Sequence, residues 1–210
     1  MRRILQRLRG APRPAAPEVS APRHAHGVVL LATGISIRNG LQAEALASAA
    51  GEPLLRELAR GALATGPDAL VVSVPADDHT ALEVVLRGLP LRCIPVPRGM
   101  AQGAALRAAL SILPASCSGA LLLPCDRART AAADLAQLLE AWRLQPQRAA
   151  YFSAGHGTPG LPALLPQAWW EELDPGNGLA LRTLLQDRHD EVSVLEARAA
   201  GQPPPDHAVA

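Results

Sequence analysis

The chain has 210 residues, a formal net charge of +1 at pH 7 and 49% hydrophobic residues, of which few are aromatic. This length suits one domain with a core of Leu, Val and Ala, and the near-neutral charge gives no support for nucleic-acid binding. No apolar run has the length of a membrane span, and the basic N-terminus lacks the apolar stretch of a signal peptide. We therefore expect a cytoplasmic protein with neither a membrane nor a nucleic-acid partner.

All the basic residues are arginine, which excludes the lysine that many phosphate-binding sites use. Cys93, Cys117 and Cys125 lack the spacing of a metal site or a disulfide framework, so reduced thiols are expected. The isolated histidines are expected at the surface: His24, His26, His79 and His189.

Composition divides the chain into three parts. Residues 1–26 are rich in Arg, Pro and Ala and are predicted to form a disordered arm, with a short membrane-surface helix as the alternative. Residues 27–198 are predicted to form the folded domain. Residues 199–210 are predicted to be a flexible, proline-rich tail.

Apolar runs alternate with segments of helical spacing along the domain. In chain order, the predicted elements are the strand 28–32, the helix 52–64, the strand 69–74, the helix 77–87, the strand 91–96, the helix 102–113, the strand 120–123, the helix 131–144 and the strands 149–153 and 192–196. Asp77 or Asp78 is expected near the N-cap of the second helix.

This alternation predicts a three-layer α/β fold, with a mainly parallel sheet, helices on both faces and right-handed crossovers. Ligands of such sheets bind outside the carboxyl ends of the strands. The rule selects three places: the turn after Ala32, the residues after Val74, and Cys125-Asp126.

The first place carries the sequence Leu31-Ala32-Thr33-Gly34-Ile35-Ser36-Ile37-Arg38-Asn39-Gly40. Gly34 permits a sharp turn with several amides directed at an anion, and Arg38 offers a forked contact to phosphate. The spacing is neither a dinucleotide fingerprint nor a P-loop. An ordinary strand-to-helix connection is the alternative.

This segment resembles the L-A-[AG]-G-x-S-x-R-M-G signature of the sugar-phosphate and molybdenum-cofactor nucleotidyltransferases. The resemblance implies a Rossmann-like nucleotidyltransferase fold. It also implies that a loop binds the phosphates of a nucleoside triphosphate, through Leu31, Ala32, Thr33, Gly34, Ser36 and Arg38. Thr33 and Asn39 depart from the signature, and the lysine that follows it in the family falls on Ala43 or Glu44.

Asp126 directly follows a predicted buried strand, and a carboxylate there suits Mg²⁺ or a helix N-cap. The family carries P-C-D-x-P at this point, so the resemblance implies that Asp126 binds the catalytic Mg²⁺ and that Cys125 is a packing residue. The second proline of this motif is absent here. Asp206 lies about where relatives carry a second metal carboxylate, although a solvated tail residue is the alternative.

Three further segments resemble the family. Residues 99–110 resemble a helix start near the substrates, which places Gly103 near phosphate, with a packing role as the alternative. His156 and Gly157 lie in a segment that relatives place over the acceptor, with a surface turn as the alternative. Residues 169–185 follow the last two helices of the cytidylyl branch, and Trp169 and Trp170 are expected in the core.

The resemblance, over residues 27–197, implies Mg²⁺-dependent transfer of CMP (or GMP) from CTP (or GTP) to a molybdopterin-type cofactor with release of pyrophosphate. Arg38 and Asp126 would be the catalytic residues, and a molybdoenzyme is the implied partner. The alternative is a non-catalytic relative that binds nucleotide or cofactor and assists molybdoenzyme maturation. A sugar-phosphate nucleotidyltransferase is a third reading, for which the domain is short.

Overall fold

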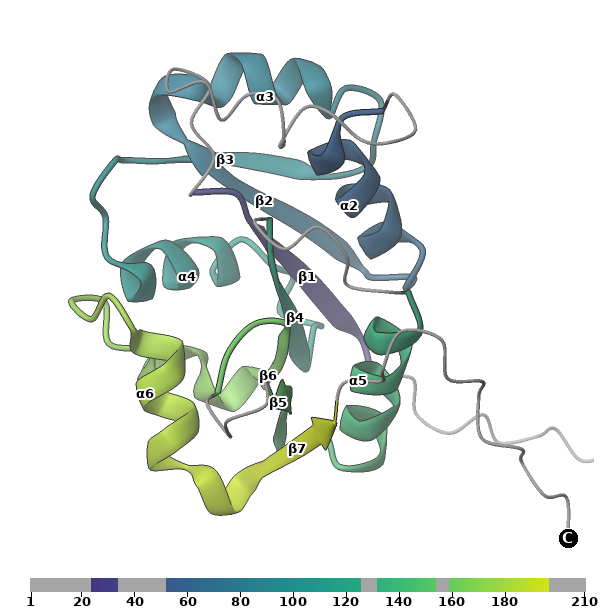
Figure 1. The fold of residues 1–210 in the computed structure, drawn as a ribbon, viewed down its shortest axis with the longest axis vertical. Helices are drawn as coiled ribbons and strands as arrows, with labels where there is room; N and C mark the ends of the chain where they lie inside the picture. Colours follow the sequence, from purple (N-terminus) through teal and green to yellow (C-terminus); the bar gives the residue numbers. More distant parts are fainter. Residues whose placement is uncertain (1–23, 34–51, 126–131, 154–158, 197–210) are drawn as a thin grey trace, which may run out of the picture.

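A seven-stranded sheet with the order β3-β2-β1-β4-β6-β5-β7 forms the centre of the molecule (Figure 1). The computed structural model describes residues 24–33, 52–125, 132–153 and 159–196. In chain order, the elements are β1 (His26–Leu31), α2 (Leu54–Leu63), β2 (Ala69–Pro75), η2 (Ala76–Asp78), α3 (His79–Val85), β3 (Arg92–Val96), α4 (Gln102–Leu110), β4 (Gly119–Pro124), α5 (Ala132–Leu144), β5 (Ala149–Ser153), β6 (Ala163–Pro166), η3 (Gln167–Glu172), α6 (Ala180–Asp187), η4 (His189–Glu191) and β7 (Val192–Glu196).

The predicted fold class is confirmed. All strands are parallel to β1 except β6, which runs antiparallel to both β4 and β5. Every predicted strand is present, and β1 begins at His26, two residues earlier than expected. The sequence analysis missed β6, a four-residue strand that directly follows Pro162 and ends at Pro166. Its shortness and flanking prolines hide the strand signal.

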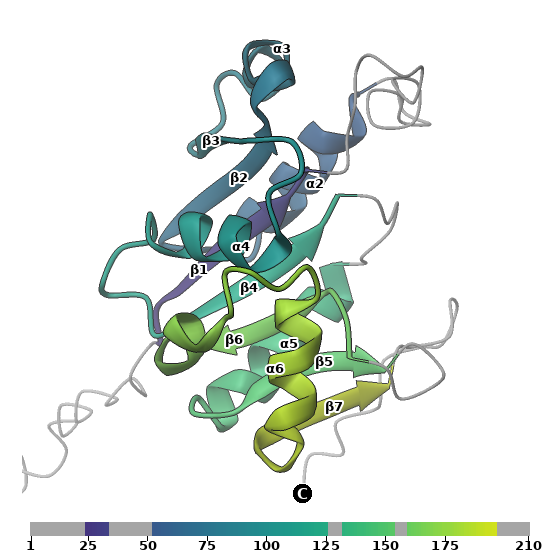
Figure 2. The same cartoon turned by 90° about the vertical axis from the view of Figure 1, so that its left-hand side faces the viewer.

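Helices cover both faces of the sheet, as Figure 2 shows with α4 and α6 in front and α5 behind. Alternate strand residues point to opposite faces, so Val28 and Leu30 join α2, α3 and α5 in one core cluster. Val29 joins α4, η3 and α6 in the other cluster. The helices pack on the sheet through an apolar side. In α2, for example, Leu55, Ala59 and Ala62 recur at helical spacing and are buried, whereas the charged side of the helix is exposed.

One connection departs from the expected uniform right-handedness. The helix α3 links β2 to β3 on the α2 face, and α4 links β3 back to β4 on the opposite face, so these two crossovers share a hand. The helix α5 leads from β4 to β5, away from β3, yet lies on the α2 face, which gives this crossover the opposite hand. Packing stabilises this arrangement, because the Trp142 ring lies on Gly119, where a Cβ would come within 2.6 Å of it.

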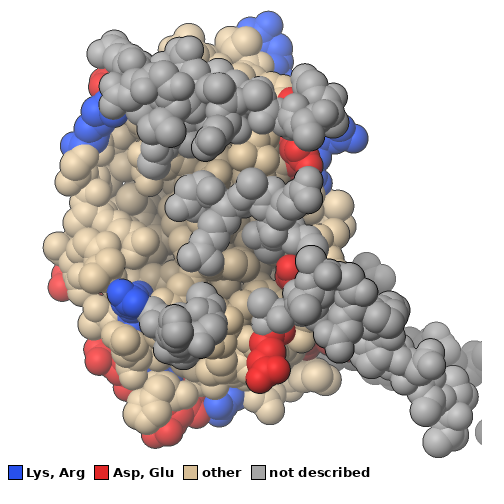
Figure 3. All heavy atoms as spheres, in the orientation of Figure 1, with Lys and Arg blue, Asp and Glu red and all other residues tan. Residues whose placement is uncertain are grey.

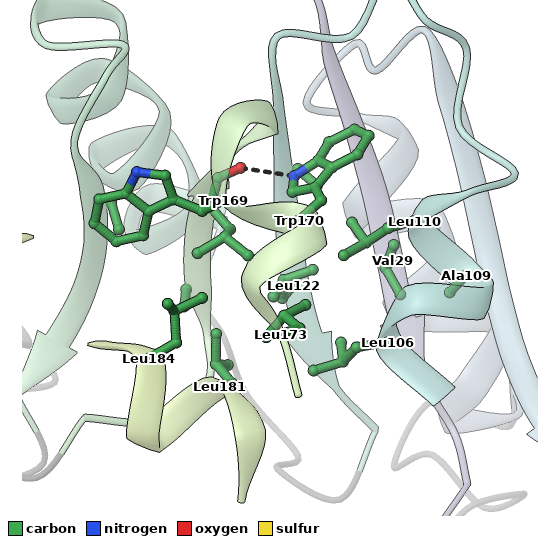
Figure 4. Packing of buried hydrophobic residues seen from close by; sticks show 14 of the residues in the cluster. Val29, Leu106, Ala109, Leu110, Leu122, Trp169, Trp170, Leu173, Leu181 and Leu184 are labelled. Atoms are coloured by element: carbon green, nitrogen blue, oxygen red, sulfur yellow. Dashed lines mark hydrogen bonds between the residues drawn. The ribbon is translucent and has the colours of Figure 1, made fainter. Parts of the chain in front are cut away.

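The two adjacent tryptophans lie in the core, as expected. Trp169 is 3% and Trp170 9% exposed, and both pack among leucines of α4, α6 and the sheet (Figure 4). The indole Nε1 of Trp170 donates a hydrogen bond to the Leu165 carbonyl oxygen at 3.3 Å. These rings are therefore packing residues and offer no stacking platform to a ligand.

His26 is buried, so its expected place at the surface is wrong. The Thr65 hydroxyl donates to the Ala62 carbonyl oxygen at 2.7 Å, and therefore accepts from Nε2 of His26 at 3.2 Å. This bond satisfies the imidazole inside the strand β1, where a polar group without a partner would be unfavourable. Burial, followed by the nearby Arg143 charge, lowers the pKa of His26, although Asp68 acts in the opposite direction.

The strand β3 forms one edge of the sheet and contains a proline. Pro95 pairs in register with Val74 of β2, and the ladder continues to Val96. Proline is tolerated at this place because an edge strand needs ladder hydrogen bonds on one side alone.

Candidate nucleotide site at the carboxyl edge of the sheet

The ends of β1 and β4 meet at the carboxyl edge of the sheet. The backbone amide of Ala32 donates to the Ser73 carbonyl oxygen of β2 at 2.9 Å, and the amide of Cys125 donates to the Leu31 carbonyl oxygen at 3.0 Å. Ala32 and Cys125 are buried, whereas Thr33 is exposed. Residues 34 and 126 thus directly follow two chain segments that are joined to each other.

The second half of the sheet brings more of the predicted site to the same edge. The strand β5 is parallel to β4, so it ends at this edge, and the antiparallel β6 begins there. Segment 154–162, which connects them, therefore attaches at this edge. The strand β7 is parallel to β5 and pairs Glu196 with Ser153, so the chain that leads to Asp206 also leaves from this edge.

The predicted site residues divide into two groups. Leu31, Ala32 and Thr33 lie at the end of β1, where they were expected, and Gly103 lies in the first turn of α4. The other predicted site residues lie outside the described residues: Gly34, Ser36, Arg38, Asp126, His156, Gly157 and Asp206. Their roles stay predictions.

Gly103 has a packing role in this structure. Its amide donates to the Asn177 carbonyl oxygen at 3.1 Å. A Cβ at this position would overlap the Asp174 carbonyl oxygen and lie 2.9 Å from Cβ of Ala180. The chain itself thus fills the space beside this amide, and the predicted contact of Gly103 with phosphate remains untested.

An ion cluster that the sequence analysis missed lies beside this junction, at the ends of β2 and β3. Arg98 donates from Nε to Asp77 at 2.7 Å and from Nη2 to Asp78 at 3.1 Å. Asp78 stands at the N-cap position of α3, but neither its side chain nor any other caps that helix, because the carboxylate binds the guanidinium instead. The side chain of Asp78 is 4% exposed, so the pair is partly desolvated.

This cluster could have been found from the sequence. Asp77 and Asp78 follow Val74, one of the three places that the carboxyl-end rule selects, and Arg98 follows the next strand. Two carboxylates and one guanidinium carry a net negative charge, which disfavours a triphosphate at this place. Phosphates are therefore better accommodated toward the ends of β1 and β4.

Charged side chains are sparse in the middle of the face shown in Figure 3. The visible Arg atoms of the described residues lie near the outline of that face, Asp and Glu atoms also lie inside its right half, and the tan area left of the centre is uncharged. Within the described ranges, no three His, Cys, Asp or Glu residues come together in a group that could hold a metal ion. No helix among these residues has the length and apolar character to cross a membrane.

The mainly parallel sheet, its strand order and the helices on both of its faces define a three-layer α/β protein. A family model described as the MobA-like NTP transferase domain matches residues 28–192. The chain therefore belongs to this family. A search of curated proteins finds no match.

Solved structures share the fold at low sequence identity. Rv0371c from Mycobacterium tuberculosis is 21% identical, with a TM-score of 0.68 over 82% of this chain and 88% of that one. Its complex with manganese is 18% identical over the same shares, with a TM-score of 0.67. A nucleotidyl transferase from Methanothermobacter is 15% identical, with a TM-score of 0.67 over 84% and 88%. A CMP:2-keto-3-deoxy-manno-octonic acid synthetase with bound CTP is 14% identical, with a TM-score of 0.61 over 83% and 90%.

Proposed function

We propose that this chain transfers CMP or GMP from CTP or GTP to a molybdopterin-type cofactor. A phosphate oxygen of the cofactor attacks the α-phosphorus of the nucleotide, the bond from that phosphorus to the β-phosphate oxygen breaks, and pyrophosphate leaves. Such chemistry needs little covalent participation by protein, because positioning and charge neutralisation supply the rate. A molybdoenzyme that receives the product is the proposed partner.

The junction of β1 with β4 carries this proposal. The Cys125 amide bonds to the Leu31 carbonyl oxygen at 3.0 Å, and the phosphate-loop motif and Asp126 follow this contact along the chain. Amides after Thr33 and the guanidinium of Arg38 are proposed to bind the triphosphate. Segment 154–158, with His156 and Gly157, starts from the same edge and is proposed to face the acceptor.

A divalent metal fits the donor chemistry at this edge. Mg²⁺ binds through one or two carboxylates together with substrate phosphates and water, so Asp126 alone is a sufficient protein ligand. Bound there, the ion would neutralise charge on the phosphates. The manganese complex of Rv0371c supports a divalent ion in this fold.

A non-catalytic, nucleotide- or cofactor-binding role in molybdoenzyme maturation is the second candidate. It is supported by the contact between the Gly103 amide and the Asn177 carbonyl oxygen, because a backbone acceptor of the chain occupies an amide that the resemblance assigns to phosphate. The replacement of the family lysine by Ala43 or Glu44 acts in the same direction, since neither residue neutralises phosphate.

Titration calorimetry of the full chain with CTP and with GTP, each with and without Mg²⁺, tests the proposal. Micromolar binding of one nucleotide that requires Mg²⁺ is the expected result, and it identifies the donor. Absence of binding of both nucleotides at millimolar concentration would overturn the proposal in favour of a role without nucleotide.

Two variants test the assigned residues. Asp126→Ala is expected to abolish the effect of Mg²⁺ on binding, whereas Asp190→Ala, which removes an exposed carboxylate of η4, leaves it unchanged. Arg38→Ala is expected to weaken triphosphate binding about tenfold more than monophosphate binding, because a charge-assisted hydrogen bond is lost. Arg60→Ala, on the exposed side of α2, is the matched control. An equal loss of affinity for the triphosphate and the monophosphate would show that Arg38 does not contact the terminal phosphates.

A further inference from the structure

The connection between η3 and α6 lies against the start of α4. The Gly103 amide donates to the Asn177 carbonyl oxygen at 3.1 Å, and the backbone approach at Asp174 leaves no room for a Cβ on residue 103. Figure 2 shows α4 and α6 on the same side of the sheet with this connection between them. A glycine is therefore required at this position by the close approach of two backbones.

Asn177 makes contacts in two further directions. Its side-chain Oδ1 accepts from the Leu179 amide at 2.7 Å, and its Nδ2 donates to the Thr183 hydroxyl at 3.1 Å. Leu179 stands at the N-cap position of α6, where its own side chain has no group that could cap. One residue thus joins the first turn of α4 to the first turn of α6.

The turn that presents Asn177 is held by its own hydrogen bonds. The Asp174 carboxylate accepts from the Gly176 amide at 2.8 Å, and the Asp174 carbonyl oxygen accepts from the Asn177 amide at 3.2 Å. At the start of the connection, Arg107 of α4 donates to the Leu173 carbonyl oxygen at 3.4 Å, and to the Glu171 carbonyl oxygen of η3 at 2.8 Å. The connection is therefore attached to α4 at both ends.

This junction stands at the carboxyl edge of the sheet. The helix α4 follows β3 and so begins at that edge, and α6 precedes β7, which is parallel to β5, so α6 begins there too. Leu31 at the end of β1 and Leu161 before β6 pack against the same core cluster as α4 and α6. The end of β1 and the start of β6 thus share one core cluster with the two helices that the junction connects.

We propose that Asn177 is a positioning residue for nucleotide binding. By joining the first turns of α4 and α6, it holds the beginning of α4 at the carboxyl edge of the sheet, the edge at which the nucleotide is proposed to bind. This proposal rests on the proposed function. A site that is held in place before the ligand arrives loses less conformational entropy on binding, so release of α4 weakens binding without removing any ligand contact.

The test compares Asn177→Ala with Asn177→Asp in the full chain. Alanine removes both side-chain hydrogen bonds. Aspartate keeps the acceptor for the Leu179 amide, and its second oxygen can accept from the Thr183 hydroxyl. Thr183→Val removes only the hydrogen bond between Asn177 Nδ2 and the Thr183 hydroxyl, and gives an intermediate case. Gly103→Ala disturbs the same contact from α4, and Gly61→Ala, a helical glycine of α2 with open space around it, is its matched control.

Two measurements are made on each variant: amide hydrogen exchange over residues 99–105 and 174–181, and calorimetric binding of CTP and GTP with Mg²⁺. Asn177→Ala is expected to exchange faster in both segments and to bind nucleotide about tenfold more weakly. Asn177→Asp is expected to keep the hydrogen-exchange rates and the nucleotide affinity of the wild type. If Gly103→Ala does not fold, the Asn177 pair still decides the question.

The outcomes separate this proposal from the function on which it rests. Faster exchange with unchanged nucleotide binding in Asn177→Ala would show a structural role alone and overturn the positioning role. Unchanged amide hydrogen exchange in Asn177→Ala would show that the side-chain hydrogen bonds of Asn177 do not hold the start of α4, and it would also overturn the positioning role. A wild-type chain that binds neither nucleotide overturns the proposed function, and the positioning role with it.

Discussion

The two helical layers both pack on the sheet through apolar clusters, but they differ in the polar contacts that join their elements to one another. The layer of α2, α3 and α5 is held mainly by apolar packing that includes Trp142, and Arg56 links α2 to the carbonyl oxygens of Val85 and Arg87. The layer of α4, η3 and α6 is cross-linked by arginines. Arg107 binds carbonyl oxygens and the carboxylate of η3, and Arg188 pairs with Glu172 and lies 4.8 Å above the Trp169 ring.

The difference follows from the kind of element in each layer. An α-helix satisfies most of its own backbone groups, so a packed apolar face is enough to hold α2 or α5. The helix η3 is a 3-10 helix with poorer internal geometry, and its last carbonyl oxygens need donors from elsewhere. Arg107 provides them. The second layer therefore adds side-chain bonds from arginines to its apolar cluster, and it is the layer that contains the Asn177 junction.

The largest effect is expected from the apolar layer. Trp142 is 1% exposed and packs on Gly119, so Trp142→Ala creates a cavity and is expected to reduce the free energy of unfolding by about 4 kcal/mol. Leu144→Ala, two residues further on the same helix and 78% exposed, is the control, with a change of about 0.5 kcal/mol or less. Urea unfolding measures both. Similar losses for the two variants would contradict the assignment of the core.

A smaller effect is expected from the cross-linked layer. Arg107→Ala removes the donor to the carbonyl oxygens of Glu171 and Leu173 and is expected to reduce the free energy of unfolding by about 1–2 kcal/mol. The exposed Arg60 of α2 serves as control, since Arg60→Ala removes an exposed ion pair. Hydrogen exchange of η3 should rise in the Arg107 variant and stay unchanged in the control. If η3 exchanges at the wild-type rate, packing alone holds this layer.

The smallest effect is a pH dependence at the first strand. Because the pKa of His26 is lower in the folded than in the unfolded chain, the unfolded state binds more protons at mildly acidic pH. The stabilising contribution is thus present above the unfolded pKa, about 6.5, and is lost as the pH falls through it toward the lowered folded pKa. Urea midpoints of the wild type and His26→Gln, between pH 7.5 and 5, should show a steeper acid-side fall in the wild type. Parallel curves would exclude His26 as the source.

Most of the fold could be predicted from the sequence because local signals agreed with the tertiary structure. Apolar runs such as 69–74 and 120–123 read as buried parallel strands and are such strands. The four-residue strand β6 was not predicted because proline flanks it. The hand of the α5 crossover was not predicted because it depends on where Trp142 packs. Neither feature leaves a periodic signal in the chain.

The site was predictable at its strand ends and less so in its side-chain contacts. The carboxyl-end rule selected Ala32 and Cys125, which the structure joins through Leu31. The ion cluster was read as a helix cap, because the position of Asp78 fits one and its partner Arg98 is distant in sequence. The contact between Gly103 and Asn177 joins residues even further apart, so composition and spacing could not reveal it.

Pro95 has a consequence for association between molecules. A sheet with an open edge can recruit the strand of another chain, which leads to aggregation. On β3 the proline contributes no amide to such a recruited strand, so this edge is poorly suited to extend the sheet. The opposite edge is β7, where Val194 is 53% exposed and no proline interrupts the strand. Of the two edge strands among the described residues, β7 is therefore better suited to pair with a second copy, and Val194→Lys would be the simplest way to prevent such pairing.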